Sequence, residues 1–395
     1  MGTQHSDEII AFALGGLAGN NAHGAGFLYG AMHHGLQPRM ISCTSGQIAW
    51  VYHYLKARET GADLRELFER DIAELHQCHN LNLDYARLAL AGKSGVFRPA
   101  YAEYSYDLSM NMLKAYGDVV RHQGNVFWLE TFLRMFPGRV LVPTFAADLL
   151  TDISATFNQT AIGITFNSYC PIDGTERVYL NQAAHDMLSP SGRSYKPGDP
   201  SRHRARTKYE ALTPQAVLDG LWIYQYGFDK PDSTFVDGAY YRQIMLGELT
   251  FANKIFAVRP VSPCWLGETT TTDGPPSESP AHADLPRSYV GIEDLKTEVN
   301  FNGSYGGERA QIALMNKLVR ERDDYLAQHQ HRGASEIDLL AKYHHVDLLE
   351  VEIQVPRSFF DYVFESIDVF DAAVRELDRV LEEARARGLL TPAEV

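Results

Sequence analysis

One serine and one aspartate, far apart in the chain, each stand at the end of a short apolar segment. Ser45 is separated from the segment RMISC by a single threonine and precedes Gly46. Asp237 directly follows TFV and precedes Gly238. A serine hydroxyl that attacks an acyl carbon must lose its proton to a base within hydrogen-bonding distance. If the fold joins these two side chains, they have the chemistry of a nucleophile and its general base.

The serine stands where a strand is expected to turn into a helix, in the stretch Cys43-Thr44-Ser45-Gly46-Gln47. A nucleophile elbow places a serine on such a turn and exposes its hydroxyl beside the N-terminus of the following helix. The turn needs small residues two positions before and two positions after the serine. Cys43 is small, but Gln47 is not. This stretch alone is equally consistent with an ordinary turn in which the serine caps the helix.

A glycine-rich run, GGLAGNNAHGAG, follows the first apolar segment, EIIAFAL. Glycine has no Cβ, so the backbone of this run can approach a neighbouring segment closely. Its N–H groups could point across the end of the sheet toward Ser45, where an oxyanion would form during acyl transfer. The run is therefore a candidate oxyanion loop.

The stretches GGLAG…HGAGFL, CTSGQ and DGA, taken in this order, resemble the patatin-like phospholipase family over about residues 8 to 260. The resemblance implies a three-layer α/β/α fold, no cofactor, and a dyad in which Ser45 is the nucleophile and Asp237 the base. Two residues differ from the family pattern, because Gln47 replaces the second elbow glycine and Leu17 replaces a loop glycine. The resemblance also implies that Gly46 and Gly238 support the two motifs. The oxyanion loop that it implies consists of Gly15, Gly16, Leu17 and Gly19.

The activity implied by the resemblance is that of a serine acyl hydrolase, which cleaves lipid or carboxylic esters through an acyl-enzyme. The ordinary pKa of an aspartate, about 3.9, is low for a general base at neutral pH. Because Asp237 follows Phe235 and Val236, we expect burial to raise its pKa. Two alternatives remain at this point: an acyltransferase that uses the same acyl-enzyme, and a catalytically silent module that binds a lipid or a protein partner.

Apolar segments that end in glycine turns alternate with helical patterns, which is typical of an α/β fold with a mainly parallel central sheet. We expect one patatin-like domain over residues 1–395, with a helical insertion at about 62–136 and a Thr/Pro/Ser-rich flexible loop at about 267–290. A strand and a helix are expected at about 345–388. The other expected strands are 8–14, 39–43, 138–149, 160–167, 233–238 and 254–261, and the other expected helices are 25–35, 48–58, 213–228 and 306–330.

Composition limits the classes of partner. The 395 residues include 36 basic and 50 acidic side chains, which give a net charge of −14. Nucleic acid is excluded as a partner because binding to phosphates requires a basic surface. The N-terminus has no signal-peptide pattern, and no apolar stretch is long enough to span a bilayer, so a cytoplasmic protein is expected. Membrane contact is possible but not indicated, and the expected partner is a small-molecule acyl ester, thioester or lipid. The oligomeric state stays open.

Two other kinds of site are less consistent with the sequence. HGAGFLYG is similar to a dinucleotide-binding fingerprint, but no acidic residue between Glu8 and Glu59 could hold a ribose. The histidines lack matching carboxylates for a metal site, so no metal is expected. For His23, in the glycine-rich run, a structural hydrogen bond to the turn is favoured over a direct role. The histidine-rich stretches are HQCHN at 76–80 (with His76, Cys78 and His79), His33-His34 and His344-His345.

Overall fold

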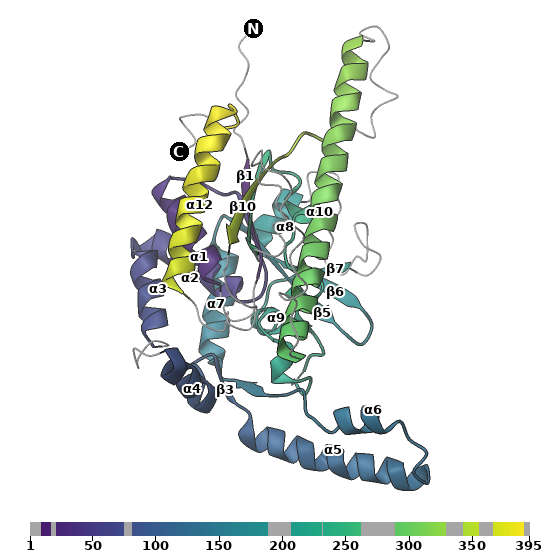
Figure 1. Cartoon of the computed structure of the whole chain (residues 1–395). Helices are drawn as coiled ribbons and strands as arrows, with labels where there is room; N and C mark the ends of the chain where they lie inside the picture. The colour runs from purple at the N-terminus through teal and green to yellow at the C-terminus, as the bar shows by residue number, and fades with distance from the viewer. Residues whose placement is uncertain are drawn as a thin grey trace, which may run out of the picture.

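The computed structural model describes residues 9–16, 21–74, 81–188, 207–230, 232–261, 289–328, 343–354 and 366–390. Its centre is a sheet with the strand order β10-β9-β1-β2-β5-β6-β7, and β8 pairs with β5 (Figure 1). The strands are β1 (Ile10–Leu14), β2 (Met40–Cys43), β5 (Gly163–Cys170), β6 (Thr175–Leu180), β7 (Thr207–Ala211), β8 (Val236–Asp237), β9 (Lys254–Val261) and β10 (Asp347–Gln354).

The four pairings along β10-β9-β1-β2-β5 are parallel, as predicted for a mainly parallel sheet. Strand β5 is antiparallel to β6 and β8, and β6 is parallel to β7. All five residues of β1 are buried, which is typical of a parallel strand covered on both faces. Three phenylalanines pack edge-on or tilted around this strand: Phe12, Phe27 and Phe256.

Helices cover both faces of the sheet (Figure 1). On one side lie α1 (Ala22–His33), α2 (Gln47–Thr60), α3 (Leu64–Ala73) and α12 (Ile367–Ala386), and on the other lies α10 (Tyr289–Gln328). The small residues of α1 allow α12 to pack closely, since a Cβ at Gly26 would overlap the carbonyl oxygen of Phe370. Helix α12, near the C-terminus, therefore packs closely against helix α1, near the N-terminus. Within the described residues, the body also contains helices α7 (Ala147–Gln159), α8 (Gln182–Leu188) and α9 (Pro214–Gly220).

The predicted insertion is mostly helical and contains α3, α4 (Leu81–Ala91), α5 (Tyr101–Arg121) and α6 (Trp128–Leu133). It also contains β3 (Phe97–Pro99), which pairs antiparallel with β4 (Leu141–Pro143) in a separate two-stranded sheet. Residues 101–136, which we call the α5–α6 arm, project away from the central sheet beyond this hairpin (Figure 1). No residue of α5 is buried.

Three predicted elements differ from the structure. The strand expected at 138–149 is limited to β4, which lies outside the central sheet. Residues 147–149 belong instead to the first turn of helix α7, whose buried face includes Leu150, Ile153 and Phe157. The helix expected at 213–228 ends at Gly220 and is followed by the 3-10 turn η1 (Tyr224–Tyr226). The helix expected at 306–330 begins earlier, at Tyr289. Strands β6 and β7 were not predicted.

The other predicted elements are confirmed to within a few residues, including β10 and α12 at the C-terminal end. Thr213 caps α9, with its hydroxyl oxygen 3.1 Å from the amide nitrogen of Ala216, and Pro214 occupies the first turn as expected. The loop predicted at 267–290 lies almost entirely outside the described residues. Among the helices that the structure describes, none combines the length and the apolar character that a bilayer-crossing segment requires.

Candidate active site

Ser45 occupies a sharp turn between β2 and α2. Its backbone φ is +57°, a left-handed conformation that non-glycine residues seldom adopt and that is typical of a strained nucleophile elbow. Its carbonyl oxygen accepts a 3.0 Å hydrogen bond from the amide of Ile48 in the first turn of the helix. The residue at the N-cap position is Gly46, and no side chain caps α2. The alternative in which Ser45 serves as the helix cap is therefore wrong.

The structure brings Ser45 and Asp237 together. The Ser45 hydroxyl donates a hydrogen bond to the Asp237 carboxylate, and the exposed fractions of the two residues are 1% and 2%. Asp237 ends strand β8, where its amide donates to the carbonyl of Trp222 at 2.8 Å. Its Oδ1 accepts a 2.9 Å hydrogen bond from the amide of Ala239. These contacts fix the carboxylate beside the elbow.

Burial raises the pKa of Asp237 from 3.8 to about 7, while hydrogen bonds from the Ser45 hydroxyl and the Ala239 amide act in the opposite direction. The expected effect of burial on this carboxylate is thus present. A base whose pKa lies near the working pH is partly ionised at that pH, and its ionised form binds a proton more tightly than an ordinary aspartate does. Asp237 is therefore suited to remove the hydroxyl proton of Ser45.

The first two glycines after β1 lie against the elbow, but their amides are already engaged. The Gly15 amide donates to the carbonyl of Val258 at 2.9 Å, and the Gly16 amide donates to the hydroxyl of Thr44 at 2.6 Å. This corrects the expectation that these two N–H groups face an acyl oxygen, since each is used within the fold. The next two candidates, Leu17 and Gly19, lie outside the described residues.

One backbone donor next to the serine has no acceptor within the described part of the chain, namely the amide of Gly46. It belongs to the residue that follows the nucleophile and lies at the N-terminus of the 14-residue helix α2. In nucleophile elbows this amide contributes to the oxyanion hole. Gly46 is thus more than a supporting residue, because its N–H group is a candidate oxyanion donor.

Close contact between Gly16 and the elbow depends on the absence of a side chain. A Cβ at Gly16 would lie 2.5 Å from the Cβ of Ser45 and 2.5 Å from the carbonyl oxygen of Thr44. The Gln243 side chain donates to the carbonyl of Gly16 at 3.0 Å. The Gln243 carbonyl in turn accepts hydrogen bonds from the Thr44 hydroxyl and, at 3.3 Å, from the Gly16 amide. Gln243 therefore joins the end of β1 to the elbow.

Gln47, which replaces the second elbow glycine, is accommodated by the first helix. Its side-chain amide lies 2.9 Å from Nε2 of His23 and contacts the carbonyls of Gly15 and Asn21. A Cβ at Gly24 would overlap the Gln47 amide. His23 makes the predicted structural hydrogen bond to the Gly15 carbonyl, at 2.7 Å, and burial lowers its pKa from 6.5 to about 4. The glutamine thus packs against α1, where a glycine leaves room for it.

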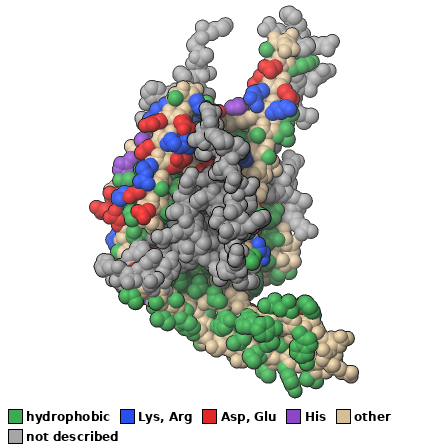
Figure 2. Space-filling model, in the orientation of Figure 1, with side chains coloured by type: hydrophobic (Ala, Val, Ile, Leu, Met, Phe, Trp, Pro, Cys, Tyr) green, Lys and Arg blue, Asp and Glu red, His purple; other side chains and the backbone are tan. Residues whose placement is uncertain are grey.

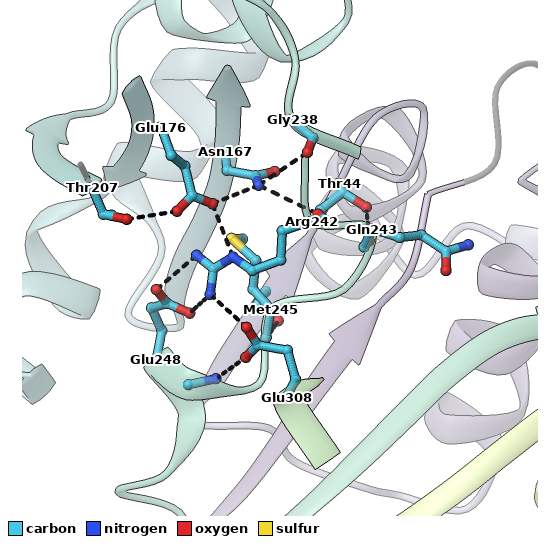
Figure 3. A network of polar contacts seen from close by, with 12 residues as sticks. Thr44, Asn167, Glu176, Thr207, Gly238, Arg242, Gln243, Met245, Glu248 and Glu308 are labelled. Atoms are coloured by element: carbon cyan, nitrogen blue, oxygen red, sulfur yellow. Dashed lines mark hydrogen bonds and ion pairs between the residues drawn. The ribbon is translucent and has the colours of Figure 1, made fainter. Parts of the chain in front are cut away.

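A buried arginine organises the segment that follows Asp237 (Figure 3). Arg242 Nε lies 2.9 Å from Glu176, and the two terminal nitrogens lie 2.8 and 2.9 Å from the two oxygens of Glu248. Glu308 approaches Nη1 at 3.5 Å. Burial opposes the charge of Arg242, but the three carboxylates outweigh it and raise its pKa. Each of these ionic side chains is less than 4% exposed.

The same network fixes the backbone on both sides of the arginine (Figure 3). Asn167 donates to Glu176 at 2.9 Å and contacts the carbonyls of Gly238 and Arg242 at 3.4 Å. Glu308 accepts the amides of residues 246 and 247 at 3.2 and 2.9 Å. A Cβ at Gly238 would overlap the Asn167 side chain, so this glycine allows the chain to turn away from Asp237.

Sequence reasoning missed Gln243, and it missed Arg242 with its three carboxylate partners. The local signal is the apolar run IML (residues 244–246), which indicates a buried segment although Arg242 and Glu248 lie close to its two ends. Glu176 and Glu308 come from β6 and α10, so their pairing with Arg242 depends on the tertiary fold. No pattern along the chain marks them as partners.

An aromatic cluster lies beside the carboxylate. Trp222, Tyr226 and Val236 are buried together, and Tyr224 stacks on Tyr240 with ring centroids 3.7 Å apart. Burial, together with the charge of Asp237, raises the pKa of Tyr226 and of Tyr240. Phe97 and Leu141 of the β3–β4 hairpin pack against this cluster. The insertion thus contacts the surroundings of the site through its base.

The histidine pairs form contacts within the protein. His34 lies 2.6 Å from Asp378, and His345 lies 3.3 Å from Asp347. Nε2 of His344 lies 3.0 Å from the carbonyl of Ala252. Within the described ranges no group of three or more potential metal ligands occurs, and residues 76–79 fall outside those ranges.

Comparison with protein-family models and with curated proteins gives no match for this chain.

A substitution at Gly16 should disturb the elbow. We expect Gly16→Ala to lower the free energy of unfolding by about 1–3 kcal/mol, because overlap with Ser45 and Thr44 forces the backbone apart. Gly15→Ala is the matched control, since the nearest atom to its Cβ would be 3.3 Å away. Urea denaturation measures both. Equal losses for the two variants would show that the predicted overlap is not what limits this position.

Removal of Arg242 should be far more costly than removal of an exposed arginine with similar partners. Arg242→Leu removes the guanidinium that contacts three buried carboxylates and should cost about 3–5 kcal/mol. Arg379 on α12 also pairs with two glutamates, but its side chain is 52% exposed, so Arg379→Leu should cost less than about 1 kcal/mol. Denaturant unfolding compares the two. Comparable losses would contradict a structural role for the buried network.

Proposed function

We propose that this chain is a patatin-like serine acyl hydrolase, which cleaves esters of apolar acyl groups with Ser45 as nucleophile and Asp237 as base. The observation that carries the proposal is a single contact: a serine in a left-handed turn donates a hydrogen bond to a buried carboxylate whose pKa is about 7. A structural serine does not require a strained backbone or a carboxylate poised near neutral pH.

The proposed reaction has two halves. In the first, Asp237 takes the hydroxyl proton while the Ser45 oxygen bonds to the acyl carbon, and the same proton then passes to the departing alcohol oxygen. In the second, Asp237 takes a proton from water, whose oxygen attacks the acyl-enzyme, and the proton returns to the Ser45 oxygen as it leaves. The Gly46 amide at the N-terminus of α2 supports the oxyanion in both halves. An alcohol in place of water would make the chain an acyltransferase.

The site is suited to apolar acyl groups and to small probes. Trp222, Tyr226 and Val236 form a buried apolar wall next to the base. Ser45 itself is 1% exposed, so an acyl group must enter between the residues that cover it. A small fluorophosphonate, which requires little space, is therefore the appropriate first probe, and product analysis with short acyl esters then separates hydrolysis from transfer.

Labelling by the fluorophosphonate tests the dyad. We expect Ser45→Ala to abolish labelling and Asp237→Asn to slow it by about a hundredfold, which is typical of the loss of a general base. Ser154→Ala, at a buried serine of α7, should label at the wild-type rate. Labelling is followed by intact-protein mass spectrometry. A Ser45→Ala variant that still labels fully would exclude Ser45 as the nucleophile.

The labelling rate should depend on pH through the base. The ionised form of Asp237 accepts the proton, so the wild-type rate should fall about tenfold per pH unit below the pKa of about 7 and reach a plateau above it. The Asp237→Asn variant should show no such dependence in the same range. A wild-type profile that is flat between about pH 5 and 8 would exclude Asp237 as the titrating base.

Asp237 should also make stability fall as the pH rises from about 4 to about 7. Its pKa is about 7 in the folded protein against an ordinary value of 3.8, so between these values the folded state binds the extra proton and stability falls as pH rises. Relative to wild type, Asp237→Asn should therefore gain up to about 4 kcal/mol between about pH 4 and pH 8. Urea denaturation at the two pH values measures this. A constant difference would contradict the raised pKa.

A further inference from the structure

The α5–α6 arm exposes a large apolar surface. Figure 2 shows hydrophobic side chains gathered over the arm on the face in view, while charged side chains gather on the helices of the body. Patches of this extent mark interaction surfaces on proteins. The large hydrophobic residues of the arm that are more than half exposed are Tyr101, Tyr106, Met112, Leu113, Tyr116, Val120, Phe127, Trp128, Leu129, Phe132, Leu133 and Phe136.

Helix α5 separates its apolar and charged residues. With 3.6 residues per turn, its exposed apolar residues fall within one half of the helix circumference, and the other residues in that half are Ala, Gly, Ser and Val. The charged residues fall on the opposite half. The apolar residues are Tyr101, Tyr106, Met110, Met112, Leu113, Tyr116 and Val120, and the charged residues are Glu103, Asp107, Lys114, Asp118 and Arg121.

The arm carries little unbalanced charge, in contrast to the chain as a whole, whose net charge is −14. Each acidic residue of the arm is paired with an arginine. The pairs are Glu103 with Arg98 (2.6 Å), Asp107 with Arg139 (2.7 Å), Asp118 with Arg121 (3.9 Å) and Glu130 with Arg134. The arm therefore has neither the acidic surface of the body nor the surplus of basic residues that attracts anionic lipids.

We propose that the α5–α6 arm docks the protein on a neutral, zwitterionic lipid surface, with the apolar half of α5 and the exposed face of α6 in the interfacial layer. An uncharged amphipathic face matches a zwitterionic interface, where no net charge needs to be neutralised. Tyrosine and tryptophan, which have an apolar body and a polar tip, favour the boundary between lipid and water. This docking role rests on the proposed acyl hydrolase function and extends it, because the substrate would then be a lipid within a zwitterionic layer.

The base of the arm is continuous with the surroundings of the dyad. Val140, just beyond the arm, donates its amide to the carbonyl of Gln225 at 2.9 Å, within the η1 turn. The neighbouring Tyr224 stacks on Tyr240, which lies three residues after Asp237 in the chain. A lipid surface held by the arm would thus meet the protein beside the apolar wall of the candidate site.

Binding to phosphatidylcholine vesicles tests this role. In a flotation assay, the full chain with Ser45→Ala should bind these vesicles, and a several-fold increase in NaCl should not weaken binding. Leu113→Glu with Leu129→Glu, at side chains 64% and 59% exposed, should lower the affinity about tenfold or more. The matched control is Ile172→Glu with Leu314→Glu, at side chains 78% and 58% exposed outside the arm, and it should bind normally.

Several results would overturn the inference. These are no binding to phosphatidylcholine, binding only to anionic vesicles, or equal losses in the two double variants. A dimer that dissociates on Leu113→Glu with Leu129→Glu, without vesicle binding, would assign the arm to a second copy of this chain. Fluorophosphonate labelling of Ser45 in lipid-free buffer is measured on the wild type in parallel. Labelling of Ser45 without vesicle binding would contradict only the lipid-docking role of the arm. Vesicle binding that depends on the arm, without labelling of Ser45, would contradict only the proposed hydrolase function.

Discussion

The ionic contact between Arg242 and its three carboxylates holds the candidate site in place. The segment after Asp237 runs through the interior, where its polar groups must find partners or cost several kcal/mol each. Arg242 draws together β6, α10 and the segment's own turn, and so fixes the path of the chain on which Gln243 lies. Gln243 then joins the elbow at Thr44 to the end of β1. The arginine thus adds to the backbone contacts that already fix Asp237 and Ser45.

Burial raises the pKa of Asp237, which suits it to act as a base, and also lowers the free energy of unfolding when the carboxylate is ionised. The aromatic wall excludes water from the carboxylate, which raises its pKa to about 7 and makes its ionised form costly in the folded state. Two hydrogen-bond donors, the Ser45 hydroxyl and the Ala239 amide, recover part of that cost. The left-handed backbone of Ser45 adds local strain. Functional sites commonly combine such costs, and the surrounding packing, here the Arg242 network, offsets them.

The outer helices of the body and the α5–α6 arm present surfaces of different chemical character. The body carries charged side chains on its outer helices, which keep it hydrated, while the α5–α6 arm leaves aromatic and aliphatic side chains exposed (Figure 2). A helix that buries none of its residues gains little stability from tertiary packing. A second surface, in the form of a lipid layer, would supply the apolar contact that the arm does not obtain from its own fold.

The sequence by itself determined the features that depend on local pattern. Short apolar runs predicted β1, β2 and β9, the first of them ended by glycine. The small residues around Ser45 predicted the elbow, because steric limits on a tight turn act between neighbours in the chain. The position of Asp237 after apolar residues predicted its raised pKa. The tertiary structure alone decided that the Gly15 and Gly16 amides are engaged within the fold and that Gln47 fits beside α1. It also decided which carboxylates surround Arg242 and that the insertion projects as an arm. These outcomes depend on which distant segments meet, since a buried polar group takes whichever partner the fold brings to it, and no local pattern encodes that choice.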